Sequence, residues 1–105
     1  MQDIDLAQMH RSAKSATKLL KALSNETRLI VLCQLVDGEK SVGELMSLVG
    51  IGQSALSQHL ARLREDGLVR TRREAQTIYY ALEGDEARRV LELLYAIYCQ
   101  PAGLC

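Results

Sequence analysis

A capped short helix, a glycine turn and a longer amphipathic segment follow one another between residues 41 and 67, and this order restricts the fold most. Ser41 and Glu44 have the spacing of a capping box, which predicts that a short helix begins there. Residues 50–52, Gly-Ile-Gly, are too few for a linker. The segment 53–66 then carries one apolar face, formed by Leu56, Leu60 and Leu63, and Gly67 closes it. Two helices joined by such a turn predict a helix-turn-helix.

The periodicity changes to that of β-structure directly afterwards. Residues 68–73 and 77–82 are rich in β-branched and aromatic side chains, and Glu74-Ala75-Gln76 is expected to join them as a hairpin. Helical periodicity returns over residues 85–100, and 101–105 contain Pro and Gly, which is typical of a flexible tail. The predicted order is α-α-α-α-β-β-α: a mainly α winged helix-turn-helix in one domain, residues 1–100.

The first helical segment carries a narrow apolar seam whose members are alternately three and four residues apart: Leu6, Met9, Ala13, Ala16, Leu20 and Leu23. Such a seam suits packing against another helix, in this chain or in a second subunit. Because the last helix also has a wide apolar face, we expect a homodimer. The expected interface includes Leu6, Met9, Ala13, Leu91, Leu94 and Tyr95.

The second helix is expected to begin at Ser24 as N-cap, with Glu26 in its first turn. Asp37-Gly38 is expected to end it. Its predicted buried stripe consists of Leu29, Leu32, Cys33 and Val36.

Length and composition fit one small soluble domain. The chain has 105 residues, of which 48% are hydrophobic, so it can form one modest core. No apolar run approaches the ~20 residues that cross a bilayer, and the first residues lack the apolar core of a secretory signal. We therefore expect a cytoplasmic protein with no membrane partner.

The charge is balanced overall but unevenly distributed. Thirteen basic residues match thirteen acidic ones. Residues 53–73 nevertheless hold five arginines against Glu65 and Asp66, a net charge of +3. This excess has two interpretations, a solvated face or a patch that faces nucleic-acid phosphates.

The polar side chains of segment 53–66 are of the types that read double-stranded DNA. Those in its first two turns, where a recognition helix reaches base edges, are Gln53, Ser54, Ser57, Gln58 and His59. Arg62, one turn later, fits phosphate better. The hairpin residues expected to reach the backbone or minor groove are Arg72, Arg73, Gln76 and Thr77. Two alternatives stay open: Ser54 caps the helix, or His59 lies at the core edge.

Enzyme chemistry finds no support in the residues. His10 and His59 have no acidic or cysteine partner at the spacing of a metal site or catalytic triad, and no glycine-rich phosphate loop is present. We expect no catalytic site, no cofactor and no metal. Cys33, Cys99 and Cys105 form no Cys-x-x-Cys spacing. They are either inert thiols or a pair that responds to oxidants.

Four segments together resemble the ArsR/SmtB family of bacterial winged-helix repressors: residues 23–29, 43–45, 54–60 and 63–69. The resemblance covers about residues 12–100, and its Ser57-Gln58-His59-Leu60 to Gly67-Leu68-Val69 string is specific. It implies a homodimer built from the first and last helices that binds an inverted-repeat operator.

Within the family the chain resembles the BigR/SqrR/HlyU/YgaV group. The third helix has no thiol and the last has no histidine, so the family's usual metal positions are vacant. That group carries one cysteine on the second helix and one at the end of the last. It senses reactive sulfur species, and some of its members sense other oxidants. The resemblance therefore implies that Cys33 and Cys99 form a redox switch, that their bridging releases a repressor from its operator, and that Cys105 is incidental.

Three other functions remain open at the level of sequence. One is a metal sensor with an unusual site built from Cys33 and Cys99, with or without Cys105. Another is a winged-helix transcription factor whose cysteines are inert. The third is a small thiol enzyme or a dimeric adaptor that no longer binds DNA.

Overall fold

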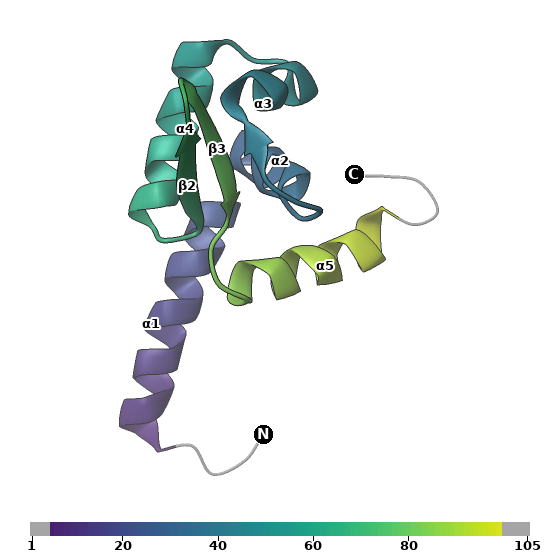
Figure 1. The fold of residues 1–105 in the computed structure, drawn as a ribbon. Coiled ribbons are helices and arrows are strands. Elements are labelled where there is room, and N and C mark those ends of the chain that lie inside the picture. Colours follow the sequence, from purple (N-terminus) through teal and green to yellow (C-terminus); the bar gives the residue numbers. More distant parts are fainter. Residues whose placement is uncertain (1–4, 100–105) are drawn as a thin grey trace.

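The computed structural model describes residues 5–99; the predicted tail and Cys105 lie outside them. Five helices and three strands follow in the order α1 (Leu6–Leu23), α2 (Glu26–Gln34), β1 (Lys40–Ser41), α3 (Val42–Val49), α4 (Gln53–Glu65), β2 (Val69–Glu74), β3 (Thr77–Leu82) and α5 (Glu86–Tyr98). This confirms the predicted winged helix-turn-helix and adds one short strand. Figure 1 shows α1 and α5 extending away from the body formed by the other elements, with α1 below α4.

The junction of α1 and α2 differs by one residue from the prediction. The N-cap of α2 is Asn25, whose side chain accepts a hydrogen bond from the N–H of Arg28 at 2.9 Å. Ser24, expected in this role, ends α1 instead, where its hydroxyl donates to the carbonyl of Lys21 at 2.8 Å. The guanidinium of Arg28 fixes the junction by donating to the carbonyls of Ala22 and Lys21.

The buried side of α2 is wider than the predicted stripe. Leu32 is fully buried as expected, but its companions are Val31 and Leu35, whereas Leu29, Cys33 and Val36 are half-buried. The reason is that α1, α3 and α4 all pack against this short helix. The helix also ends at Gln34, before the predicted stop at Asp37-Gly38.

The sheet is antiparallel with the strand order β1-β3-β2. Lys40 pairs with Tyr80 on one edge of β3, and Val69 pairs with Leu82 on the other. A two-residue strand such as β1 is too short to leave an alternating pattern, so the sequence did not predict it. Glu74 pairs with Thr77, which leaves a two-residue turn in place of the expected three; Ala75 adopts a φ of 54° there.

One aliphatic cluster forms the core between α2, α3, α4, the sheet and α5: Leu23, Val31, Leu32, Leu35, Leu45, Leu56, Leu60, Leu63, Val69, Leu82 and Leu91. The burial of Leu91 contradicts its predicted place in a dimer interface, because its side chain is 1% exposed within this one chain. No helix in residues 5–99 is both long enough and apolar enough to span a membrane.

Candidate nucleic-acid interface and cysteine helices

The capping box fixes where α3 begins. The Ser41 hydroxyl accepts from the N–H of Glu44 at 3.1 Å, and the Glu44 carboxylate accepts from the N–H of Ser41 at 2.8 Å. These backbone and side-chain hydrogen bonds hold the pKa of Glu44 below its ordinary value. Gly50 ends the helix in the left-handed region with a φ of 78°, which a residue with a Cβ adopts at a cost. The chain therefore turns sharply from α3 into α4.

Helix α4 is anchored by one face and presents the other. Leu56, Leu60 and Leu63 are at most 1% exposed. The opposite face is solvent-exposed and includes Gln53, Ser54, Ser57 and Gln58; His59 is half-buried at its edge. Gly52 occupies the N-cap position and no side chain caps the helix, so Ser54 is not the cap. The structure thus brings the predicted base-reading side chains together on one accessible surface.

Some of the arginines that are predicted to contact phosphates already interact with other groups of the protein. Arg62 donates from Nε to the Asp66 carboxylate at 3.1 Å, although its side chain is 52% exposed. On the wing, Arg73 donates to the carbonyl of Ala75 at 3.2 Å. Gln76 and Thr77 are exposed at the hairpin tip. Arg73, Gln76 and Thr77 are thus exposed on or at the turn of the β2–β3 hairpin, and their contact with DNA stays a prediction.

Arg72 is held more firmly than any other arginine of the wing. Its Nη2 lies 2.5 Å from Oε1 of Glu39 and its Nη1 lies 3.2 Å from Oε2 of Glu74. Its guanidinium also stacks 4.5 Å above the centre of the Tyr79 ring. The hydrogen bonds from Arg72 hold the pKa of Glu39 below its ordinary value, and the two carboxylates raise the pKa of Arg72.

The partner of Arg72 was missed at the level of sequence. Glu39 lies 33 residues from Arg72, and β1 brings the two together by pairing with β3. No local pattern marks Glu39, because it is one of several acidic residues near the end of α2. Only the pairing of β1 with β3 would have revealed this contact. A strand of two residues is too short to be detected from the periodicity of the sequence.

The two candidate sensing cysteines lie on α2 and at the end of α5. Cys33 is half-buried against the core, and Cys99 is 6% exposed. The N–H of Cys99 closes α5 by donating to the carbonyl of Tyr95 at 2.8 Å. The side chain of Arg88 on α5 donates to the carbonyl of Val36, three residues after Cys33. A direct contact therefore links α5 to the turn after α2.

No three His, Cys, Asp or Glu side chains cluster as ligands for a metal ion among residues 5–99. The metal site considered from sequence uses Cys33 and Cys99, with or without Cys105, and Cys105 lies outside this part of the chain. The described residues therefore offer no built metal centre.

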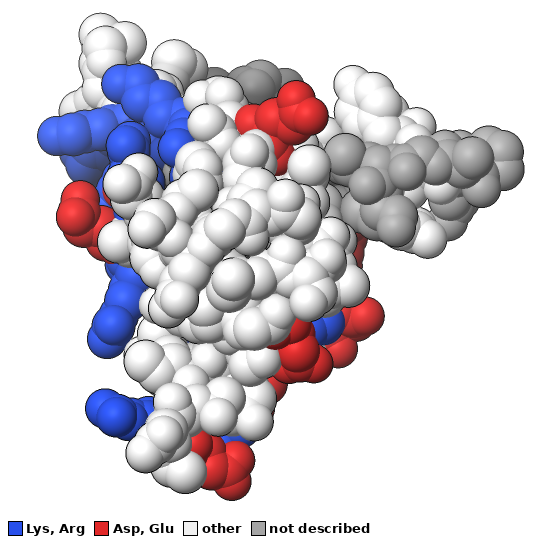
Figure 2. Space-filling model, turned by 90° about the horizontal axis from the view of Figure 1, so that it is seen from above, with Lys and Arg blue, Asp and Glu red and all other residues white. Residues whose placement is uncertain are grey.

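Helix α4 is anchored by leucines, follows a tight turn and is flanked by an arginine-bearing hairpin. This arrangement defines a winged helix-turn-helix DNA-binding protein. Figure 2, seen from above, shows most of the Lys and Arg atoms of this view on its left, the side on which α4 and α1 lie in Figure 1.

Comparison with known proteins identifies the family. Residues 25–71 match the family described as bacterial regulatory protein, arsR family. The transcriptional activator HlyU of Vibrio cholerae is 54% identical over 92% of this chain and 90% of its own length. The biofilm growth-associated repressor of Agrobacterium fabrum is 48% identical over 94% of this chain and 85% of its own. The chain belongs to the ArsR family, in the branch of HlyU and BigR.

Solved structures agree with this assignment. Reduced HlyU from Vibrio cholerae matches with a TM-score of 0.87 at 55% identity, over 90% of this chain and all of that one. The homodimeric winged helix-turn-helix domain Mb0332 from Mycobacterium bovis matches with a TM-score of 0.76 at 28% identity, over 92% of this chain and 89% of that one. The protein is thus a DNA-binding transcriptional regulator and not an enzyme.

Proposed function

We propose that this regulator is a homodimeric repressor that leaves an inverted-repeat operator when Cys33 and Cys99 of one subunit are bridged by a reactive sulfur species. One observation carries the proposal: Arg88 joins the helix that ends at Cys99 to the turn after the helix that holds Cys33. Because α2 packs against α3 and α4, a change at this junction reaches the recognition helix.

Exposed apolar side chains on α1 and α5 support the homodimer. Those of α1 are Leu6, Met9 and Leu20; those of α5 are Leu93, Tyr95, Ile97 and Tyr98. Leu93 and Ile97 replace the buried Leu91 of the sequence prediction. Large apolar side chains exposed together on a helix mark an interaction site. Two copies related by a twofold axis would present two α4 helices to half-sites about one helical turn apart.

Sequence choice is assigned to α4 and general affinity to the cations. Gln53, Ser57 and Gln58 carry amide and hydroxyl groups that pair with base edges, and Ser54 and His59 lie beside them. Arg62, Arg72 and Arg73 contribute attraction to phosphates, with Gln76 and Thr77 at the wing tip. Of these cations, Arg72 must exchange its carboxylate partners for a phosphate.

The proposed chemistry uses a persulfide, RSSH, as oxidant. The thiolate of one cysteine attacks the terminal sulfur, the S–S bond of RSSH breaks, and RS⁻ leaves and takes a proton. The second thiolate then attacks the cysteine sulfur that carries the added sulfur, forms the disulfide and expels HS⁻, which is protonated to H₂S. The two thiols lose two electrons and the added sulfur gains them. Overall, two thiols and RSSH give one disulfide, RSH and H₂S.

The magnitude of the switch follows from the change in occupancy. Turning an operator from almost fully bound to almost fully free requires the bridge to disfavour the bound form by about 5.5 kcal/mol. A bridge that strained α2 and α5 equally in both forms would release nothing. The bridged state must therefore disturb the placement of α4 that binding requires.

The test measures operator affinity before and after treatment with a persulfide, using a duplex selected by the wild-type protein from a random pool. We expect Cys33→Ser and Cys99→Ser to bind the operator and to lose the response. Cys105→Ser is the matched control and should keep both. A Cys99→Ser protein that still releases DNA after treatment would refute the two-thiol switch. Cobalt(II) titration tests the metal alternative, because thiolate coordination gives charge-transfer absorption and a disulfide does not.

A further inference from the structure

Helix α1 is the most cationic element in residues 5–99, and the proposed function gives this charge no role. Its 18 residues include Arg11, Lys14, Lys18 and Lys21 and no acidic residue. All four side chains are exposed. By contrast, α4 has two arginines against one glutamate, so the recognition helix itself is nearly neutral. A basic helix face is usually just a solvated surface. A binding role for it must therefore be argued from where the face lies in the structure.

The charged residues of α1 occupy one face of the helix. At 3.6 residues per turn, Lys14, Lys18 and Lys21 fall in line with His10, and Arg11 lies at the edge. The three lysines and His10 also line a shallow hollow along α1. We call these five residues the cationic face. The exposed apolar residues Met9 and Leu20 lie on a different side and Leu23 faces the core, whereas Leu6 lies one turn before His10 in the same row.

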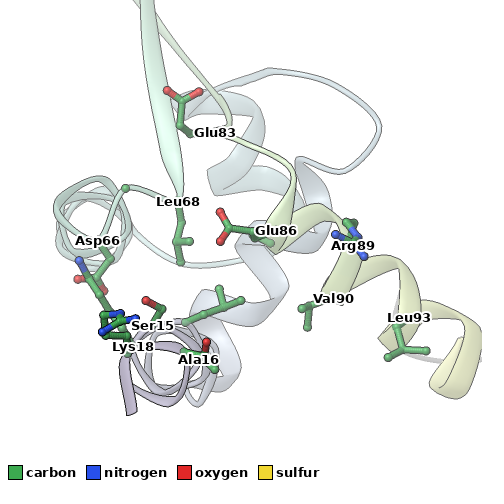
Figure 3. A pocket seen from close by; sticks show the side chains of 15 residues that line it. Ser15, Ala16, Lys18, Asp66, Leu68, Glu83, Glu86, Arg89, Val90 and Leu93 are labelled. Atoms are coloured by element: carbon green, nitrogen blue, oxygen red, sulfur yellow. The ribbon is translucent and has the colours of Figure 1, made fainter. Parts of the chain in front are cut away.

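The cationic face adjoins the end of α4 through Lys18. A groove of about 900 Å³ separates α1 from both α4 and α5. Its charged lining residues are Arg11 and Lys18 of α1, Asp66 at the end of α4, Glu83 after β3, and Glu86 and Arg89 of α5. Val90 and Leu93 of α5 complete the apolar part of the lining. Figure 3 shows Lys18 and Ser15 near Asp66, and Ala16 on the side of α1 nearer Val90 and Leu93.

The cations of α1 form no ion pair within the described part of the chain. The ion pairs of residues 5–99 involve Lys40, Arg62, Arg70 and Arg72. No cation of α1 takes part in one of them. Two of the arginines expected to meet phosphates, Arg62 and Arg72, are thus paired internally, while none of the four cations of α1 forms an ion pair within residues 5–99.

From these positions we propose that the cationic face of α1 binds the phosphate backbone of the DNA beside the groove that α4 enters. The proposal rests on the proposed function, because α4 must first place the duplex on this side. Lys14 and Lys21 are about 10 Å apart along the axis, and each strand of B-DNA carries one charge per ~3.4 Å of its length. Two or three phosphates are therefore within the span of the lysines. The sign of the charge and the shared side favour DNA over an acidic protein.

The test is the salt dependence of binding to a random-sequence duplex, measured with the full chain. Replacing Lys14, Lys18 and Lys21 together by Gln should lower the slope of log K against log salt by about 0.9 for each phosphate that is no longer neutralised. If all three lysines bind phosphates, the affinity change between 50 and 200 mM salt should shrink by roughly 40-fold. Binding should weaken equally for the selected operator and for the random duplex, because phosphates carry no sequence information.

The controls separate this inference from the proposed function. Arg89→Gln removes one exposed cation from α5, on the wall of the groove that faces α1, and should leave the slope unchanged, whereas Lys14→Gln alone should lower it by about 0.9. Sedimentation checks that each variant keeps the wild-type mass.

A wild-type slope in the triple variant, with operator binding intact, would overturn the inference and leave the proposed function standing. A wild-type protein that selects no operator would overturn both. Equal effects of Lys14→Gln and Arg89→Gln would show that only net charge matters and would also overturn the inference.

Discussion

Arg72 on β2 and Glu39 before β1 are joined by a contact of 2.5 Å between Nη2 and Oε1, and a second hydrogen bond runs from Nε to the same carboxylate at 3.2 Å. The pair ties the wing to the segment between α2 and β1. It also neutralises an arginine whose sequence position predicts a phosphate contact. A duplex that takes up Arg72 must compete with Glu39 and, on the other side, with Glu74.

The first prediction follows from this competition. Glu39→Gln should strengthen binding to operator and random DNA alike and steepen the salt slope by up to about 0.9, because Arg72 gains freedom to meet a phosphate. Arg72→Ala should weaken binding less than Arg73→Ala does. In the double variant Glu39→Gln with Arg72→Ala, the gain should disappear. Equal gains with and without Arg72 would instead assign the effect to the removed negative charge of Glu39 and refute the pairing argument.

The second prediction concerns the capping box of α3. Ser41→Ala should lower the free energy of unfolding by about 1 kcal/mol, measured by urea denaturation. Glu44→Ala should also destabilise the protein at neutral pH. Because the pKa of Glu44 is lowered in the folded state, its contribution is fully present above its ordinary value of 4.5 and is lost as pH falls through the folded pKa.

The pH series provides the check on that assignment. The stability difference between wild type and Glu44→Ala should be constant near neutral pH and decline below about pH 4.5. Glu86→Ala, which removes an acidic residue from the first turn of α5, where no side-chain cap bond forms, is the matched control. A difference that grew on acidification would contradict the predicted sign.

Local signals predicted the part of the fold that is built from neighbouring residues. The Ser41–Glu44 box, the leucine face of α4 and the bounds of β3 all depend on residues within one turn or one strand, and the structure confirms them. The assignment of Ser24 failed at this same scale because two adjacent residues, Ser24 and Asn25, are both good N-caps. The conformation of the loop between α1 and α2 decides which of the two residues is the N-cap, and the residue types alone do not predict that conformation.

Contacts between distant segments set the features that sequence did not predict. Leu91 and Leu93 both fit an apolar helical face, but only the position of α5 against the core buries Leu91 and leaves Leu93 60% exposed. The partner of Arg72 likewise depends on β1 meeting β3. The charge of α1 was visible as a run without acidic residues, yet only the structure shows that Arg11 and Lys18 line the groove beside Asp66 while Lys14 and Lys21 lie outside it.

The third prediction separates sequence choice from general affinity. Gln58→Ala should reduce the preference for operator over random DNA, since a bidentate glutamine–adenine pair discriminates by about 1–3 kcal/mol. Arg73→Ala should weaken both complexes equally and lower the salt slope by about 0.9. Competition binding at two salt concentrations measures both quantities. If Gln58→Ala changed both affinities by the same factor, α4 would not be the reading element at this position.

The fourth prediction concerns the dimer. Leu93→Glu places a charge on the exposed apolar side of α5 and should raise the dimer dissociation constant by about tenfold or more, a change of ~1.4 kcal/mol. Leu48→Glu is the matched control, because Leu48 is 52% exposed on α3 and Leu93 is 60% exposed. It should leave the dimer intact. Sedimentation over a concentration series distinguishes the two, and equal behaviour would remove α5 from the interface.

The fifth prediction is that the oxidised bridge forms within one subunit. Arg88 and Val36 belong to the same chain, so the link that holds α5 against the end of α2 acts inside each protomer. Persulfide-treated protein should therefore migrate as a monomer in denaturing gels without reductant. Mass spectrometry should assign the loss of two hydrogens to peptides containing Cys33 and Cys99.

The variant Arg88→Met keeps the length of the aliphatic stem but cannot donate a hydrogen bond to the carbonyl of Val36. It should slow bridging while leaving the operator affinity of the reduced protein unchanged. A covalent dimer in the gel, or a bridge to Cys105, would place the switch elsewhere; a normal bridging rate in Arg88→Met would show that this link does not position the two thiols.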